Sequence, residues 1–350
     1  MKREPIGKWQ DVSMTDLFFA FRKGKADCFF ERSICIASQF AEYELGLAEK
    51  LKALLSRLQA GQTAELLTEN LGTTRVVAKK LSTAPKNGAA PESHRFFSDP
   101  SRAFESLCSS RTLTPEFRLI GDFPVEMHVL SALWINLVGH KFDAVLSKSA
   151  YGSRLRRYRP EPGMPKGSVG DYHLEAVGSF QPYFGPYKEW RSKGLKAMRT
   201  ELEAGHAVVG ISMDLTSYYH RVDPSFIGDS RFHAEVGIAL SEWELDFTKS
   251  FAATLVKWSK LVAAEMHVLG CNKRDVAVGG LPIGLSISRV VANALLVGLD
   301  QDIEHGLTPI YYGRYVDDLF LVLRDPGDMV TAESLLAYFA ARTRCFPATN

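Results

Sequence analysis

The stretch YYGRYVDDLFLVLR, residues 311–324, decides the fold that we expect for this chain. Two short apolar runs flank the acidic pair Asp317 and Asp318, a pattern that predicts two strands joined by a tight turn. Adjacent carboxylates between apolar strands repel each other and lose hydration, so a partner cation is expected beside them. An Asp–Asp pair is more often a solvated turn, but the apolar flanks argue against that interpretation here.

A third acid ends another apolar run, HAVVGISMD at residues 206–214. A continuous apolar run of this length predicts a buried strand. Asp214 would then project from a rigid strand end into a cleft, and pairing with a strand of the 311–324 segment would bring it close to Asp317. The carbonyl of Leu215 could add a hard oxygen ligand for Mg²⁺ at the same place. Taken alone, an Asp that merely caps a strand end is the commoner situation.

A glycine-rich loop followed by a helix is predicted from GLPIGLSISRVVAN, residues 280–293. Glycine lets the backbone approach a ligand closely. Ser286, Arg289 and Asn293 follow at spacings of three and four, so they should line one polar stripe of the helix. That stripe could face a nucleotide and a template base. A loop and a helix with one polar stripe are common, however, so this feature is weak in isolation.

In this order, the three segments resemble the sequence blocks of reverse transcriptases: D-x4-aromatic, LPxG-x-x-S-x6-N and YxDD. The resemblance covers residues 207–323 and extends more weakly back to about residue 116. It implies an α+β, right-hand polymerase fold with fingers and a ferredoxin-like palm. The expected regions are an N-terminal helical segment at 1–65, a fingers-like region at 66–205 and the palm at 206–350. Only about thirty residues follow Asp318, so we expect the thumb to be absent or to lie beyond this chain.

The resemblance also implies roles for individual residues. Asp214 and Asp317 would bind two Mg²⁺ ions, with Mn²⁺ as the alternative, and Asp318 would assist. Two such ions activate a primer 3′-hydroxyl and stabilise the leaving pyrophosphate. Tyr219 matches the aromatic sugar gate of the family, whose ring excludes a 2′-hydroxyl by steric clash; a core tyrosine is the alternative. The expected activity is RNA-directed DNA synthesis from dNTPs, onto a 3′-hydroxyl or a protein hydroxyl, on an RNA or DNA template-primer.

Further positions resemble family residues that bind the incoming nucleotide: Arg118, Arg154, Gly284, Ser286 and Asn293. Arginine suits phosphate oxygens because its planar guanidinium donates paired hydrogen bonds to them. A surface salt bridge is the alternative interpretation of the two arginines.

The chain also departs from the typical family pattern. Ile283 stands where a glutamine is usual, and Arg289 where a proline is common. These departures and the N-terminal element RKGKADCFFE, residues 22–31, make the chain similar to bacterial abortive-infection and defence-associated reverse transcriptases. That similarity implies a role in anti-phage defence. Two other functions stay open: an RNA-synthesising polymerase on the same palm, and a non-catalytic nucleic-acid-binding scaffold.

Composition indicates an ordinary globular protein, because 46% of the 350 residues are hydrophobic and 23% are charged. The sequence has no uninterrupted apolar run of about 18 residues, so we expect no membrane span. The five cysteines are scattered and form no CxxC pair, which predicts a reduced, cytoplasmic protein without a zinc cluster. A homo-oligomer, a partner protein and a non-coding RNA stay open as partners.

Positive charge is concentrated between residues 141 and 200, which hold twelve Lys or Arg against five Asp or Glu. Aromatic residues interleave with these charges: Tyr151, Tyr158, Tyr172, Tyr183, Phe184, Tyr187 and Trp190. A basic segment with stacking rings suits a groove that follows a nucleic-acid backbone. A solvated face combined with core aromatics is an equally good interpretation.

Periodicity supplies the remaining secondary structure. Apolar residues at three- to four-residue spacing predict helices at about 15–58, from residue 125 onward and at 239–269. Residues 116–124 alternate as a short strand does, and the turn-forming residues of 85–102 predict a loop.

Overall fold

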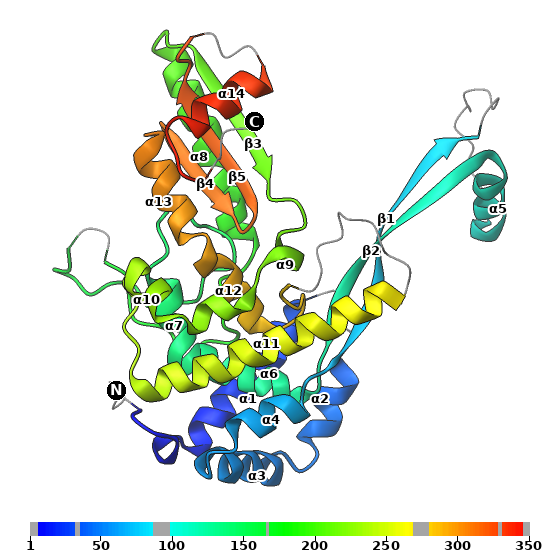
Figure 1. Cartoon of the computed structure of the whole chain (residues 1–350), viewed down its shortest axis with the longest axis vertical. Coiled ribbons are helices and arrows are strands. Elements are labelled where there is room, and N and C mark those ends of the chain that lie inside the picture. The colour runs from blue at the N-terminus through cyan, green and yellow to red at the C-terminus, as the bar shows by residue number, and fades with distance from the viewer. Residues whose placement is uncertain are drawn as a thin grey trace.

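The computed structural model describes residues 6–31, 36–86, 99–165, 168–268, 280–327 and 331–345 of the chain. These residues form a mixed α and β structure with two small antiparallel sheets (Figure 1). The expected α+β class is confirmed at this level. None of the helices in these ranges has the length and apolar character that a membrane span requires.

The larger sheet has three strands in the order β3-β5-β4, with bounds Val208–Asp214, Asp318–Arg324 and Tyr311–Tyr315. Both outer strands run antiparallel to β5. The predicted hairpin of residues 311–324 and the predicted strand before Asp214 are therefore confirmed. Their pairing places Asp214 opposite Asp318 in the register.

The prediction that the 206–214 strand is buried is wrong. β3 is an edge strand, and Ile211 is its one buried residue. An edge strand pairs on one side only, so its apolar residues are less enclosed than those of a central strand. The central strand β5 carries the buried apolar run, since Leu319, Leu321 and Val322 are almost fully enclosed.

Helices cover both faces of this sheet. On one face, α8 (Phe184–Glu203) packs so closely that a side chain in place of Gly194 would collide with the ring of Phe320. On the other face, α13 (Val297–Gly306) and α14 (Ala332–Ala340) bury Ile303 and Phe339 against the alternate residues of β5. The alternation of side chains along β5 thus supplies two apolar faces, one for each layer of helices.

The second sheet is a long ribbon that projects from the rest of the chain (Figure 1). β1 (Thr73–Pro85) pairs with β2 (Arg111–Asp122), and α5 (Pro100–Ser110) lies near the far end of the ribbon. The predicted strand at 116–124 belongs to β2 but is only part of it. Most of the predicted loop at 85–102 lies outside the described residues, and α5 begins within it because Asp99 accepts hydrogen bonds from Ser101 and Arg102 at the start of the helix.

The remaining helices enclose the larger hydrophobic core. They include α1 (Met14–Phe30), α2 (Ala37–Glu44), α3 (Leu47–Gln59), α4 (Thr63–Glu69), α6 (Val125–Trp134), α7 (His140–Ala144), α9 (Tyr218–Arg221), α10 (Ser230–Val236), α11 (Glu242–Val268) and α12 (Ser286–Leu295). The predictions of helices within 15–58, from residue 125 onward, within 239–269 and after the glycine loop are confirmed, whereas α4, α9 and α10 were not predicted. A π-helical segment, Ile135–Gly139, joins α6 to α7. α6 lies at the centre, and every residue of it except Glu126 is buried.

Candidate active site

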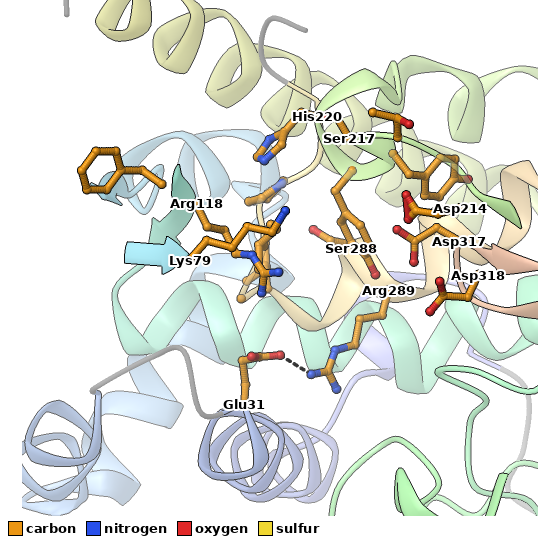
Figure 2. A pocket seen from close by; sticks show the side chains of 18 residues that line it. Glu31, Lys79, Arg118, Asp214, Ser217, His220, Ser288, Arg289, Asp317 and Asp318 are labelled. Atoms are coloured by element: carbon orange, nitrogen blue, oxygen red, sulfur yellow. Dashed lines mark hydrogen bonds and ion pairs between the residues drawn. The ribbon is translucent and has the colours of Figure 1, made fainter. Parts of the chain in front are cut away.

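The three predicted acidic residues come together at one end of the three-stranded sheet. Asp214 ends β3, Asp318 begins β5 opposite it, and Asp317 lies in the turn between β4 and β5. The backbone amide of Leu215 donates a hydrogen bond to the carbonyl of Asp317 at 3.1 Å, which fixes the end of β3 to this turn. The three carboxylates face the same side of a pocket (Figure 2). Strand pairing therefore brings Asp214 to the Asp317–Asp318 turn, as the sequence predicted.

The turn that carries Asp317 has an unusual backbone. Val316 has a φ of 60°, which a β-branched residue rarely adopts. The neighbouring Arg314 is fully buried, and its Nε lies 2.7 and 3.0 Å from the two carboxylate oxygens of Asp300. Its Nη1 donates to Asn293 Oδ1 at 2.6 Å and to the carbonyl of Val316 at 3.3 Å. Through the bond to the Val316 carbonyl, this buried network fixes the turn on the side of the protein interior.

Electrostatics at the turn favour a bound cation. Burial raises the pKa of Asp317, and the nearby charges of Asp318 and Asp214 raise it further, while Arg118 opposes the shift. Burial, followed by the charge of Asp214, also raises the pKa of Asp318. A divalent cation would relieve this repulsion, and carboxylate oxygens are ligands that Mg²⁺ prefers.

Within the described ranges, no three His, Cys, Asp or Glu side chains already lie together as a ready-made metal site. Protein sites for Mg²⁺ commonly use one or two carboxylates and complete the coordination with water and substrate phosphates. The chemistry of Asp214, Asp317 and Asp318 therefore fits Mg²⁺ or Mn²⁺. The backbone carbonyl of Leu215 was predicted as a fourth ligand. The amide of Leu215 fixes its main chain beside Asp317, but among the described residues Leu215 does not line the pocket.

The acids form one wall of a pocket of about 600 Å³. Ligand sites in proteins commonly have volumes of this size. Across the pocket, Lys79 and Arg118 extend from the two strands of the ribbon (Figure 2). The pocket thus has an acidic wall, suited to metal ions, and a basic wall, suited to phosphate groups.

The predicted glycine loop closes a third side of the pocket. Pro282, Ile283 and Gly284 line it, and the carbonyl of Ile283 accepts a hydrogen bond from Gly121 in β2 at 2.9 Å. Gly280 has a φ of 72°, and any side chain there would collide with the backbone of Tyr219. The loop therefore joins the ribbon to Tyr219, and Gly284 lies where it was predicted.

Tyr219 also lines the pocket, as predicted. Its ring is half-buried, and burial raises its hydroxyl pKa. The carbonyl of Tyr219 accepts a hydrogen bond from Leu281 at 2.7 Å. The backbone of Tyr219 is thus fixed at the pocket wall.

Two predicted nucleotide-binding residues of α12 do not reach the pocket. The hydroxyl of Ser286 donates to Asp27 in α1 at 3.1 Å, and both side chains are buried. The amide of Asn293 donates to the carbonyl of Gly152 at 2.8 Å while its oxygen accepts from Arg314. The prediction for Ser286 and Asn293 is corrected, because both side chains are turned into the protein, where each finds a protein partner. Arg289, the third residue of the predicted stripe, does line the pocket.

Arg154 is also placed away from the pocket. Its Nε lies 3.0 Å from Asp143 Oδ1, and its other donors bind the carbonyls of Ser147, Ala150 and Asp143. A guanidinium with all its groups committed to one carboxylate and a loop backbone has a structural role. The predicted contact of Arg154 with a triphosphate is therefore corrected, whereas Arg118 does line the pocket.

Sequence reasoning missed several residues of the pocket. Ser288 lines it, is 1% exposed, and its hydroxyl has no hydrogen-bond partner within the described part of the chain. A buried hydroxyl without a partner is costly unless a ligand or water completes it. Lys79 is one of two adjacent lysines in the largely polar strand β1, so its sequence context does not single it out. Glu31, which pairs with Arg289 at the pocket wall (Figure 2), has no sequence signal because the two are 258 residues apart.

Comparison with known proteins adds no relative. No protein-family model matches this chain, and no curated protein matches it.

Proposed function

We propose that this chain is a DNA polymerase of the reverse-transcriptase type, with a right-hand arrangement of fingers and palm. The observation that carries the proposal is the pairing of β3 with β5. It sets Asp214 opposite Asp318, with Asp317 in the adjoining turn, on one wall of a pocket whose other wall holds Arg118. The ribbon would belong to the fingers and the three-stranded sheet to the palm.

In the proposed nucleotide addition, each group of pocket residues would have a separate role. Two Mg²⁺ ions held by the three carboxylates would supply the charge that a phosphoryl transfer needs. Arg118 and Lys79 would bind the triphosphate of the incoming nucleotide, because they lie opposite the acids. The ring of Tyr219 would lie against the sugar and exclude a 2′-hydroxyl. The hydroxyl of Ser288 would gain the hydrogen-bond partner that it lacks among the described residues.

The biological setting that we propose is bacterial anti-phage defence in the cytoplasm, supported by the resemblance of the sequence to defence-associated reverse transcriptases. The template would be an RNA or DNA strand. The hydroxyl that primes synthesis would be the 3′-hydroxyl of such a strand or a hydroxyl of a protein. These parts of the proposal depend on the polymerase activity, so that activity is tested first.

The test measures incorporation of each labelled dNTP with Mg²⁺, with primer–template and without primer. The variant Asp317→Asn should reduce incorporation by about 100-fold or more, because it removes one of the carboxylates that would hold the Mg²⁺ ions. It should not lower the melting temperature, because it also removes repulsion among the acids. The control is Asp246→Asn, at an exposed position of α11, which should leave incorporation unchanged. A folded wild-type protein that incorporates no nucleotide under any of these conditions would refute the proposal.

A further inference from the structure

An aromatic cluster adjoins the Asp317 turn on α8, outside the described pocket lining. The rings of Tyr183 and Tyr187 stack with centroids 5.1 Å apart and an interplanar angle of 21°. Both meet Tyr315 edge-on, at 5.4 and 5.3 Å. Tyr315 is two residues before Asp317 in the chain. The cluster is therefore attached directly to the turn that carries the acids.

The outer rings of this cluster are exposed while its base is fixed. Tyr183 is 58% exposed and Phe184, beside it, is 79% exposed. Trp190 is buried and donates its indole hydrogen to the carbonyl of Gly313 at 2.9 Å. Its ring is 5.5 Å from that of Tyr187. Tyr183 thus stacks on Tyr187, which Trp190 supports, and Phe184 is the next residue in the chain after Tyr183.

The core interpretation of the aromatic residues in 141–200 does hold elsewhere. Tyr172 is packed inside, where its hydroxyl donates to Asn136 at 2.9 Å and the ammonium of Lys23 lies 4.0 Å from its ring. Tyr183 and Phe184 have no comparable enclosure. Exposed, adjacent aromatic rings of this size are uncommon on a surface without a binding role.

The charge of α8 indicates what the rings bind. Between Phe184 and Arg199 the helix has one acidic residue, Glu189, and five basic ones: Lys188, Arg191, Lys193, Lys196 and Arg199. Arg191 lies 5.9 Å over the ring of Tyr187. Single-stranded nucleic acid combines flat bases with a regular row of negative charges, and proteins bind it with aromatic rings and basic side chains together. Lys193 pairs with Glu189 at 2.6 Å, and an apolar protein surface would offer no anionic partner to the other four cations.

We propose that Tyr183, Phe184 and Tyr187 form a stacking platform for single-stranded DNA, and that the basic residues of α8 bind its phosphates. The choice of DNA over RNA rests on the proposed function, in which the strand extended at Asp317 is DNA. The platform then guides that strand to the catalytic turn through Tyr315. Binding itself requires no metal ion and no nucleotide, so it can be measured apart from catalysis.

The experiment measures the Kd of fluorescein-labelled dT12 by fluorescence anisotropy, with the full chain, EDTA and no nucleotide. Tyr183→Ala and Phe184→Ala should each weaken binding about tenfold, because each removes one stacked base contact. Tyr183→Phe keeps the ring and should bind as the wild type does. The control is Phe104→Ala, which removes a ring of similar exposure, 56%, from α5 on the ribbon. Thermal melting confirms that each variant is folded.

A second measurement tests the phosphate contacts. Arg191→Gln should reduce the slope of log Kd against log salt concentration by about 0.7, the value for one phosphate contact to a single strand. Unchanged dT12 binding in the double variant of Tyr183 and Phe184 would overturn the inference, as would loss of a protein–protein association without loss of dT12 binding. Variants that weaken binding of U12 RNA but not of dT12 would overturn it too. An inactive wild type whose dT12 binding still depends on Tyr183 would refute the polymerase proposal and support the platform.

Discussion

Replacing Arg314 with methionine tests how the structure holds the Asp317 turn. The Arg314 side chain is 0% exposed and that of its partner Asp300 is 1% exposed. The substitution removes the positive charge but keeps an apolar side chain of similar length. Asp300 would keep the hydrogen bond from the Tyr312 hydroxyl at 2.6 Å, but its charge would be left in the interior without a cation.

The expected cost follows from this burial. Removing one partner of a buried ion pair typically lowers the free energy of unfolding by about 3–5 kcal/mol, since the remaining charge is neither solvated nor paired. The Tyr312 hydrogen bond offsets part of that cost, so we expect a loss of about 3 kcal/mol. Adding Asp300→Leu removes the stranded charge and should recover at least about 1 kcal/mol of it.

Urea unfolding, followed by tryptophan fluorescence and by circular dichroism, measures these differences. The matched control is Arg324→Met, because Arg324 pairs with Glu201 at 2.9 Å but its side chain is 61% exposed. Exposed pairs contribute little, so this variant should stay within about 0.5 kcal/mol of the wild type. If Arg314→Met were no more destabilising than Arg324→Met, the buried network could not be what supports the turn.

Three further predictions concern a glycine, a histidine and the proposed sugar gate. Gly152→Ala should lower nucleotide incorporation, because the new methyl carbon would lie 2.6 Å from the backbone nitrogen of Val316 and displace the turn; Gly185→Ala, in open space on α8, is the control and should be silent. Burial lowers the pKa of His128 to about 4, so the folded state resists a proton that the unfolded state accepts, and stability should fall by about 3 kcal/mol between pH 6.5 and pH 4. Urea unfolding at several pH values should show a shallower dependence in His128→Leu, and an unchanged slope would contradict this. Tyr219→Ala should raise the use of ribonucleotides relative to deoxynucleotides in single-turnover assays, whereas a wild type that already prefers ribonucleotides would favour RNA synthesis.

The parts of the site that the sequence predicted correctly are those set by local pattern. Apolar runs on both sides of Asp317 and Asp318 specify two strands and a turn, and the run before Asp214 specifies a third. Three short antiparallel strands have few ways to pair, so an acid at the end of one strand comes close to a turn between the others. The pairing of β3 with β5 rather than with β4 is a choice that these local patterns leave open.

Errors arose where the outcome depends on how a helix is rotated. A spacing of three and four residues shows that Ser286 and Asn293 share a stripe of α12, but not what that stripe faces. In the structure it faces α1 and the Arg314 network, whereas Ser288, two residues after Ser286, reaches the pocket. Tertiary packing decides which of these two serines reaches the pocket. The local sequence around them does not determine it.

Arg154 illustrates a different difficulty. An arginine in a basic loop can bind a phosphate or fix the loop, and both uses have the same sequence pattern. Its partner Asp143 is 2% exposed and also binds Arg157 at 2.9 Å. A single buried carboxylate therefore organises two of the arginines that gave residues 141–200 their predicted nucleic-acid character. The basic residues of α8, in contrast, are exposed.

The link between α1 and α12 explains one departure from the typical reverse-transcriptase pattern. Arg289, which stands where a proline is common, binds Glu31, the residue directly after α1, and lies 5.0 Å over the ring of Phe180. Glu31 alone would repel an anionic ligand from the pocket wall, and Arg289 cancels that charge. Ser286, one turn earlier in α12, binds Asp27, one turn earlier in α1. Ser286 therefore binds α1 instead of the proposed nucleotide, while Arg289 and Glu31 together form part of the wall of the proposed nucleotide pocket.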